Sequence, residues 1–261
     1  MESLEAVKRS FRSPLKPLSS MDGAALDNLV SVRSSRLFAG LPERATSELA
    51  SCARSRTFAR NELLFLQGQP VITLILLQHG CVKHTQVGPT GTEVLLRFSG
   101  NGEIVDIQSE SPGFVHSCSA RAMENCRALV WDYQRIETFA VRFPRLADNI
   151  THLLCRKLEE LEERFREMAT EKVAKRLGLV LARLLQQIGK PSEAGIQISI
   201  RREELAQMTG STIFTVSRLL SEWSEKGVVV PGRESVTVSH PEKLVREDPD
   251  AIRRRNHFLS R

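Results

Sequence analysis

A short stretch near the C-terminus concentrates side chains that can bind the edges of nucleic-acid bases. The guanidinium of Arg218 can make two hydrogen bonds to guanine, Ser217 can donate to a base or a phosphate, and Phe214 can pack on a thymine methyl group. Thr212 is the expected N-cap of a helix that starts at Ile213, and it leaves the positive end of that helix free for a phosphate. We therefore predict that these five residues contact DNA. The alternatives are an Arg218 that is merely solvated or touches phosphate, and a Phe214 that is partly buried beneath a neighbouring hairpin.

The surrounding pattern predicts the elements that would position these side chains. Residues 202–208 have helical spacing, Thr209-Gly210-Ser211 interrupts it, and residues 212–226 are helical again. A small Ala206 suits the point where two helices cross, and glycine suits a turn with positive φ. Two short helices joined by such a turn are typical of a helix-turn-helix.

A β-hairpin is predicted directly after the second helix. Val228–Val230 and Val236–Val238 flank the turn residues Pro231-Gly232-Arg233-Glu234. A hairpin in this position corresponds to a wing, and Arg233 at its tip suits contact with a phosphate.

A long charged helix precedes this region and carries one narrow apolar stripe. Its members recur at spacings of 4, 4, 3, 4 and 3 residues: Ile150, Leu154, Leu158, Leu161, Phe165 and Met168. We expect the stripe, from Ile150 to Phe165, to pair with the same helix of a second copy, as in a short coiled coil. The alternative is that the stripe packs on the chain's own β domain.

The region from Arg56 to Trp131 has the texture of an all-β domain. Short apolar runs alternate with glycines, which is typical of a sandwich or roll. The expected strands are Leu63–Leu66, Ile72–Leu77, Val82–Gln86, Glu93–Phe98 and Ala128–Trp131.

Size and charge agree with a two-domain protein that has an anionic partner. The chain has 261 residues and a formal net charge of +6, which favours nucleic acid over a membrane surface. We find no apolar run that could span a bilayer and no secretory signal in residues 1–20, so we expect a cytoplasmic protein without a membrane partner.

Metal and catalytic sites are not predicted. The five cysteines have no zinc-type spacing and form an odd count, so we expect reduced and mostly buried thiols. The sequence also lacks a phosphate-binding GxxxxGK[ST] loop, a GxSxG elbow and an HExxH helix, so we do not expect an enzyme.

Taken together, these motifs resemble the Crp/Fnr family, that of the cyclic AMP receptor protein and the fumarate and nitrate reduction regulator. The resemblance spans residues 36–242 and rests on Leu37–Leu41, Gly68-Gln69, His79–Lys83, Gly91–Phe98, Gly102-Glu103, Pro144, Arg176-Leu177 and Gly210–Leu220.

The resemblance implies an α+β fold in five segments. These are a flexible extension (1–33), a double-stranded β-helix or jelly-roll sensor domain of the cyclic-nucleotide-binding type (34–138), a dimerisation helix (139–168), a winged helix-turn-helix (169–243) and a C-terminal tail (244–261). It also implies a homodimeric transcription regulator that binds a pseudo-palindromic operator, responds to a small-molecule effector and works with RNA polymerase.

The effector pocket departs from that of the cyclic-AMP-binding members. By resemblance, Gly102 and Glu103 match the pair that holds the ribose, but His116-Ser117 stands where an Arg-Ser pair holds the cyclic phosphate. A neutral histidine is a poor substitute for a guanidinium on a phosphate. Leu161 and Glu162 stand where hydroxyl groups contact adenine. These changes count against cyclic AMP.

Other cofactors also receive little support. No cysteine precedes Cys52, which disfavours the iron–sulfur cluster of the oxygen-sensing branch. A haem bound by His79, His84 or His116 and redox chemistry at Cys118 or Cys126 are minor alternatives, and the effector stays unidentified.

The reading helix departs as well. Phe214 stands where many members have a glutamate, and Arg201 stands where the first helix is often capped by threonine, so we expect an operator of different sequence. The alternative function is a ligand-binding or protein-interaction module whose winged domain contacts protein and not DNA.

Overall fold

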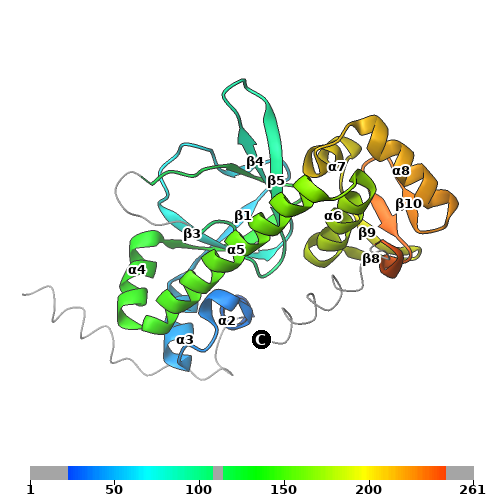
Figure 1. Ribbon diagram of the computed structural model, residues 1–261. Coiled ribbons are helices and arrows are strands. Elements are labelled where there is room, and N and C mark those ends of the chain that lie inside the picture. The colour runs from blue at the N-terminus through cyan, green and yellow to red at the C-terminus, as the bar shows by residue number, and fades with distance from the viewer. Residues whose placement is uncertain (1–22, 108–113, 245–261) are drawn as a thin grey trace, which may run out of the picture.

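The computed structural model describes residues 23–107 and 114–244. It shows a β-roll, a long helix that crosses it, and a smaller helical domain at the far end of that helix (Figure 1). None of the described helices is both long and apolar enough to cross a membrane.

Two antiparallel sheets form the β-roll. One has the order β1-β7-β3 and the other the order β2-β6-β4-β5. The strands are β1 (Arg54–Phe58), β2 (Leu63–Phe65), β3 (Thr73–His79), β4 (Val82–Val87), β5 (Glu93–Ser99), β6 (Ser119–Ala122) and β7 (Cys126–Asp132). Small and branched side chains such as Val82, Ala120 and Ala128 fill the space between the sheets. The predicted roll is confirmed.

The sequence pattern missed two of these strands, β1 and β6. In β1 only Phe58 is buried, so the arginines and hydroxyl residues before it give no apolar alternation. Strand β6 has the sequence SARA, whose small side chains carry little hydrophobic signal. Both form because they complete the hydrogen bonding of longer neighbours, β7 and β4.

Helices α2 (Gly23–Ser34), α3 (Glu43–Cys52) and α4 (Tyr133–Arg142), with the short η2 (Arg36–Phe38), cover one end of the roll. Their apolar residues pack around Trp131, whose ring N–H donates to the carbonyl of Leu49 at 2.9 Å. Helix α2 corrects the expected flexible extension, because residues 23–33 of that stretch are helical. Only Leu29 and Val32 of this helix are buried, which is too sparse a pattern to stand out in the sequence. Residues 1–22 lie outside the described part.

The long helix is α5 (Pro144–Thr170). It begins at Pro144 and not at residue 139, because Phe143 leaves the helical conformation and separates it from α4. Near its start, the side-chain amide of Asn149 donates to the carbonyls of Leu37 and Ala39, both at 2.9 Å. These bonds fix the helix against η2.

The C-terminal domain contains α6 (Val173–Ile188), α7 (Arg202–Thr209) and α8 (Ile213–Glu225) against a small sheet. The sheet has the order β10-β11-β9-β8, with β8 (Lys190–Ser192), β9 (Gly195–Ile198), β10 (Val229–Pro231) and β11 (Val236–Val238). A short helix, η3 (Pro241–Lys243), follows. The predicted helices and hairpin are confirmed. Of the expected tail, only Leu244 is described, and it is buried.

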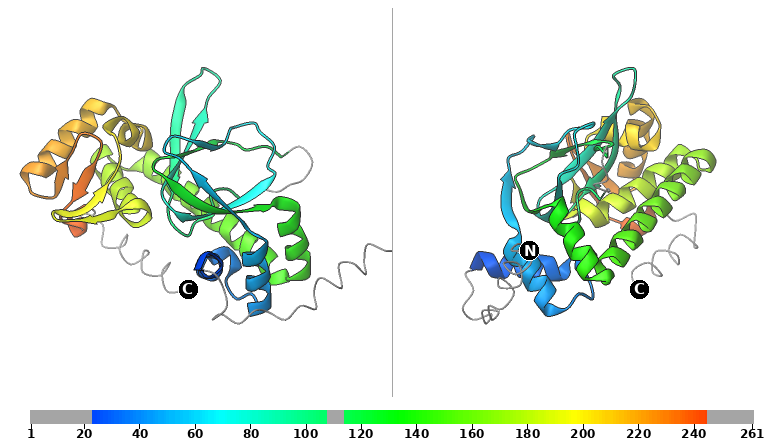
Figure 2. Two further views of the ribbon diagram at one scale, coloured as in Figure 1. Left: turned by 180° about the vertical axis from the view of Figure 1, so that it is seen from behind. Right: turned by 90° about the vertical axis from the view of Figure 1, so that its left-hand side faces the viewer.

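Strand β5 joins the two domains through a β-bulge. Thr85 of β4 pairs with Leu95 and His84 pairs with Arg97, so Leu96 is the extra residue. The bulge turns both Leu95 and Phe98 outward into the core of the C-terminal domain, whereas Arg97 stays on the inner face of the roll. Figure 1 and the left view of Figure 2 show the helical domain beside this edge of the roll.

Two polar contacts accompany this docking. The Leu95 N–H donates to the side-chain carbonyl of Gln207 on α7 at 3.1 Å, and Lys83 Nζ lies 3.5 Å from Glu204 Oε1. The space between the domains is tight, because a Cβ on Gly100 would lie 2.1 Å from the carbonyl oxygen of Gln187.

Candidate nucleic-acid interface

The turn between α7 and α8 has the predicted geometry. Gly210 has φ +56° and ends α7 in the left-handed conformation, and the Ser211 N–H donates to the carbonyl of Ala206 at 2.9 Å. Arg176 of α6 donates from Nε to the carbonyl of Thr209 at 2.9 Å. The turn is therefore held from α6 as well as by its own backbone.

The start of α8 is capped as expected. Thr212 is extended, with φ −93° and ψ 153°, and its Oγ1 accepts a hydrogen bond from the Thr215 N–H at 3.2 Å. This bond satisfies one of the backbone donors at the helix start and leaves the others directed outward. The helix therefore presents a positive end to solvent.

Side chains on α8 separate into a buried and an exposed face. Val216, Leu219 and Leu220 are buried against the domain core. Phe214 is 87% exposed, so it does not lie beneath the hairpin. Ile213 and Arg218 are also exposed, and Ser217 is half-buried between the two faces. The structure thus gathers the predicted contact residues of α8 on one accessible side.

The wing and the cap of α7 complete this side of the domain. Arg233 is exposed in the turn between β10 and β11, which is closed by a 2.7 Å bond from the Gly232 N–H to the carbonyl of Ser235. Arg201, which replaces the expected threonine cap, donates from its backbone N–H to Glu204 Oε2 at 3.0 Å. The first helix is therefore capped by a glutamate within it.

The sequence did not lead us to predict that Arg218 pairs with Glu222. Arg218 Nη1 donates to Glu222 Oε1 at 2.6 Å, and the two side chains are 68% and 43% exposed. The spacing of four residues on a helix was the available signal.

The apolar stripe of α5 is largely uncovered within one chain. Leu154, Leu158, Leu161, Phe165 and Met168 are 43% to 76% exposed. Ile150 differs, because it packs partly into the core around Trp131. One end of the stripe thus serves the chain's own sensor domain and the rest faces outward.

The expected effector residues are only partly brought together. The backbone of Gly102 and Glu103 pairs with Leu77 of β3 at 2.7 and 2.9 Å. His116 is buried, with its Nδ1 2.8 Å from Asp106 Oδ2 and its ring stacked on Phe65 at 3.7 Å. Ser117, which follows it, is exposed.

Leu161 and Glu162 are exposed on α5 and do not face the roll of their own chain. Another α5 residue, the charged Lys157, lies near Arg97, Asp106 and Glu103 of the roll. Burial, together with the neighbouring charge of Arg97, lowers the pKa of Lys157 to about 8, although Asp106 and Glu103 act in the opposite direction. Arg97 donates to Ser99 Oγ at 3.0 Å and to the carbonyl of Val105 at 2.8 Å. Sequence spacing could not reveal this group, because its members come from distant strands and a helix.

Haem and redox chemistry find little support in the described residues. His84 is fully buried, with Nε2 3.0 Å from Ser99 Oγ and Nδ1 3.7 Å from Cys118 Sγ, so both of its ring nitrogens already have partners. His79 is exposed. Burial raises the pKa of the Cys118 and Cys126 thiols, which disfavours the reactive thiolate.

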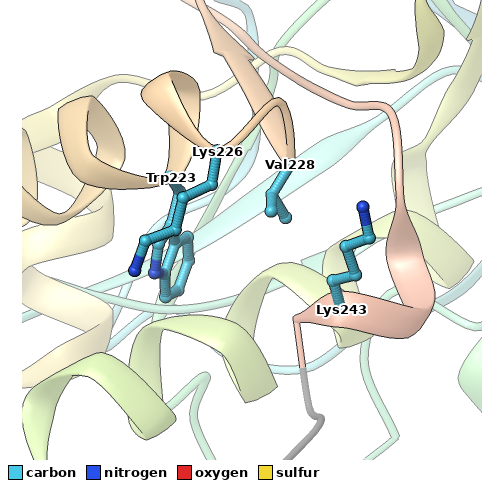
Figure 3. A pocket seen from close by; sticks show the side chains of 4 residues that line it. All are labelled: Trp223, Lys226, Val228 and Lys243. Carbon is cyan, nitrogen blue, oxygen red and sulfur yellow. The ribbon is translucent and has the colours of Figure 1, made fainter.

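An open cavity of about 350 Å³ lies at the other end of α8 (Figure 3). Trp223 and Lys226 line one side of it and Lys243 of η3 lies across the opening, with Val228 between them. This end is remote from Thr212 by the length of the helix, so the cavity is not part of the candidate reading surface.

Comparison with known proteins agrees with this geometry. The family model described as "Crp-like helix-turn-helix domain" matches residues 171–247, and that described as "Cyclic nucleotide-binding domain" matches residues 55–142. The structure of FixK2 from Bradyrhizobium japonicum superposes with a TM-score of 0.65 at 18% identity, over 75% of this chain and 97% of that one.

Two curated relatives extend the match along the chain. A CRP-like cAMP-activated global transcriptional regulator of Mycobacterium tuberculosis is 24% identical, over 80% of this chain and 95% of the relative. The cyclic AMP receptor protein of Thermus thermophilus is 30% identical, over 79% of this chain and 94% of that protein. The chain therefore belongs to the Crp/Fnr family of transcription regulators, with a sensor domain of the cyclic-nucleotide-binding type and a DNA-binding helix-turn-helix.

Proposed function

We propose that the chain acts as a homodimer that reads a pseudo-palindromic DNA operator through the exposed start of α8. The observation that carries this proposal is the accessible face of α8, which has a capped N-terminus at Thr212 and exposes Phe214 and Arg218. An α-helix that presents such an end fits the major groove of B-DNA.

Each contact residue has a distinct role in this proposal. Arg218 reads a guanine, Phe214 packs on a thymine methyl group beside Ile213, and Ser217 donates to a base or phosphate. Thr212, at the helix start, and Arg233, in the wing, position the domain on phosphates.

The second half of the proposal is the dimer. The exposed stripe of α5 provides the apolar surface, and a two-fold axis along α5 would present two copies of α8 to one duplex. Half-sites separated by about one helical turn, roughly 34 Å, would then match the protein.

The signal that controls binding is proposed to be something other than a cyclic nucleotide. The residues present do not fit the cyclic phosphate, because His116 is buried and engaged by the carboxylate of Asp106, and it carries no permanent positive charge. The carboxylate of Asp106, 2.8 Å from His116 Nδ1, would repel a phosphate placed beside His116. The cAMP activation in the name of the mycobacterial relative is therefore not carried over to this chain. Changes in RNA polymerase recruitment are the proposed output.

The test is to select binding sequences from a random duplex pool and then measure affinity by fluorescence anisotropy at several salt concentrations. We expect a palindromic consensus and binding that weakens steeply with salt, since phosphate contacts release counterions. Absent or salt-insensitive binding would reject the proposal.

Arg218 provides a sharper test of base reading. Arg218→Ala should cost about 1–3 kcal/mol on the selected operator and relax preference at one base pair per half-site. Arg233→Ala is the matched control, because loss of a phosphate contact should weaken operator and random duplex about equally. Equal losses on both duplexes for Arg218→Ala would remove the base-reading role.

A further inference from the structure

Glu222 lies on the same face of α8 as the proposed DNA contacts. Phe214, Arg218 and Glu222 follow one another at intervals of four residues, about one helical turn each. The buried residues Val216, Leu219 and Leu220 lie on the other side. A helix that enters the major groove through Phe214 and Arg218 therefore also brings a carboxylate toward the DNA.

The carboxylate is already bonded to the reading arginine. The distance from Arg218 Nη1 to Glu222 Oε1 is 2.6 Å, and Arg218 is the partner that the structure gives Glu222 within residues 23–107 and 114–244. This contact uses one of the five guanidinium N–H donors, and no other contact of Arg218 is found among residues 23–107 and 114–244.

The pair affects two kinds of DNA contact differently. Attraction to phosphates depends on net charge, and Glu222 both neutralises Arg218 and repels the DNA backbone. Recognition of guanine depends on donor geometry, and a guanidinium held by a carboxylate still offers its other edge to O6 and N7.

We propose that Glu222 is a positioning residue that sets sequence discrimination: it holds Arg218 for guanine and suppresses its binding to phosphates of random DNA. This inference rests on the proposed DNA-reading function and adds a residue and a role to it. Glu222 lowers the affinity for non-specific duplex more than that for the operator.

The test compares Glu222→Gln with wild type on the selected operator and on a random duplex of equal length. The full-length protein is used, and anisotropy is measured across a salt series. We expect random-duplex binding to tighten by about 3- to 10-fold and the operator-to-random affinity ratio to fall by a similar factor. An unchanged ratio would overturn the proposal.

Glu225→Gln is the matched control, since it removes an exposed acid from the last residue of the same helix without removing a partner of Arg218. It should change the ratio much less than Glu222→Gln. Equal changes would mean that Glu222 acts only through bulk charge, and the positioning role would be wrong.

A double-mutant cycle separates positioning from any independent contact of Glu222. In an Arg218→Ala background, Glu222→Gln should no longer alter the ratio beyond the effect of Glu225→Gln. A full effect in that background would contradict the proposal. If wild type itself fails to bind DNA in a salt-dependent way, the proposed function fails first, so the two failures are distinguishable.

Discussion

In an ordinary amphipathic helix the apolar side is buried and the charged side is exposed, but the two sides of α5 show the reverse. Toward the roll and α6, its C-terminal two-thirds bury the charged Glu167 and half-bury Lys157 and Arg164. Away from the chain, the same stretch exposes Leu158, Leu161 and other large apolar side chains. An isolated chain would gain little from this arrangement, since apolar surface prefers burial and charge prefers water. This contrast supports the proposed burial of the outward side against a second copy.

Breaking the outward side should have the largest effect. Leu158→Glu together with Leu161→Glu places charges in the proposed seam and should yield monomers, with operator binding weakened by 100-fold or more because each half-site would then bind alone. Mass by light scattering and operator affinity are the measurements. Glu159→Lys, an exposed change off the stripe, should stay dimeric. A double variant of unchanged mass would show that the stripe is not the interface.

Breaking the inward side should destabilise the fold itself. Glu167 is 3% exposed and receives two hydrogen bonds from Arg183 of α6, at 2.6 and 2.8 Å. Arg183→Ala leaves this carboxylate buried without its partner and should lower the free energy of unfolding by about 3 kcal/mol, measured by urea denaturation. Arg166→Ala is the control, because the Arg166 side chain is 45% exposed and its pairs with Glu163 and Glu171 should together contribute about 1 kcal/mol or less. Similar losses for both variants would mean that burial does not distinguish the two pairs.

Removing a charge from the inward side should instead stabilise the protein. The pKa of Lys157 is lowered from 10.5 to about 8, so the folded state disfavours its charged form. Lys157→Met should therefore raise the free energy of unfolding at pH 7 by up to about 3 kcal/mol. The stabilisation of Lys157→Met relative to wild type is present in full below pH 8. It shrinks between pH 8 and 10.5, because Lys157 of the folded wild type is then neutral and no longer carries the cost of a half-buried charge.

Urea denaturation at several pH values between 7 and 9.5 measures this change. Lys172→Met, an exposed substitution in the link between α5 and α6, is the control and should not stabilise the protein comparably. A destabilised Lys157→Met variant would indicate that the ammonium has a favourable anionic partner.

The helix-turn-helix was predictable from sequence because local rules decide it. Gly210 is required by a left-handed turn, Thr212 by an N-cap, and the apolar spacing of α8 by its packing on α7. The roll strands with long apolar runs were predictable for the same reason. The ionic contacts inside the roll were not, since Arg97, Asp106 and Lys157 meet only after the sheets have closed.

Two local features were missed for different reasons. Helix α2 uses only Leu29 and Val32 for packing, so its pattern is too sparse to separate it from a flexible leader. Glu222 follows Arg218 by four residues, a spacing that predicts an ion pair on any helix. The first omission reflects tertiary contacts that override weak propensity, whereas the second was readable from the sequence.

The extra residue in β5 has a consequence for how the chain transmits a signal. Because Leu96 bulges, one strand presents Arg97 to the interior of the sensor and Phe98 to the core of the DNA-binding domain, with no intervening element. Both domains therefore share this strand, so a shift of β5 in the sensor domain also shifts Leu95 and Phe98 in the core of the C-terminal domain. Because α7 packs directly on β5, a displacement of this strand would reach the helix-turn-helix without passing along α5.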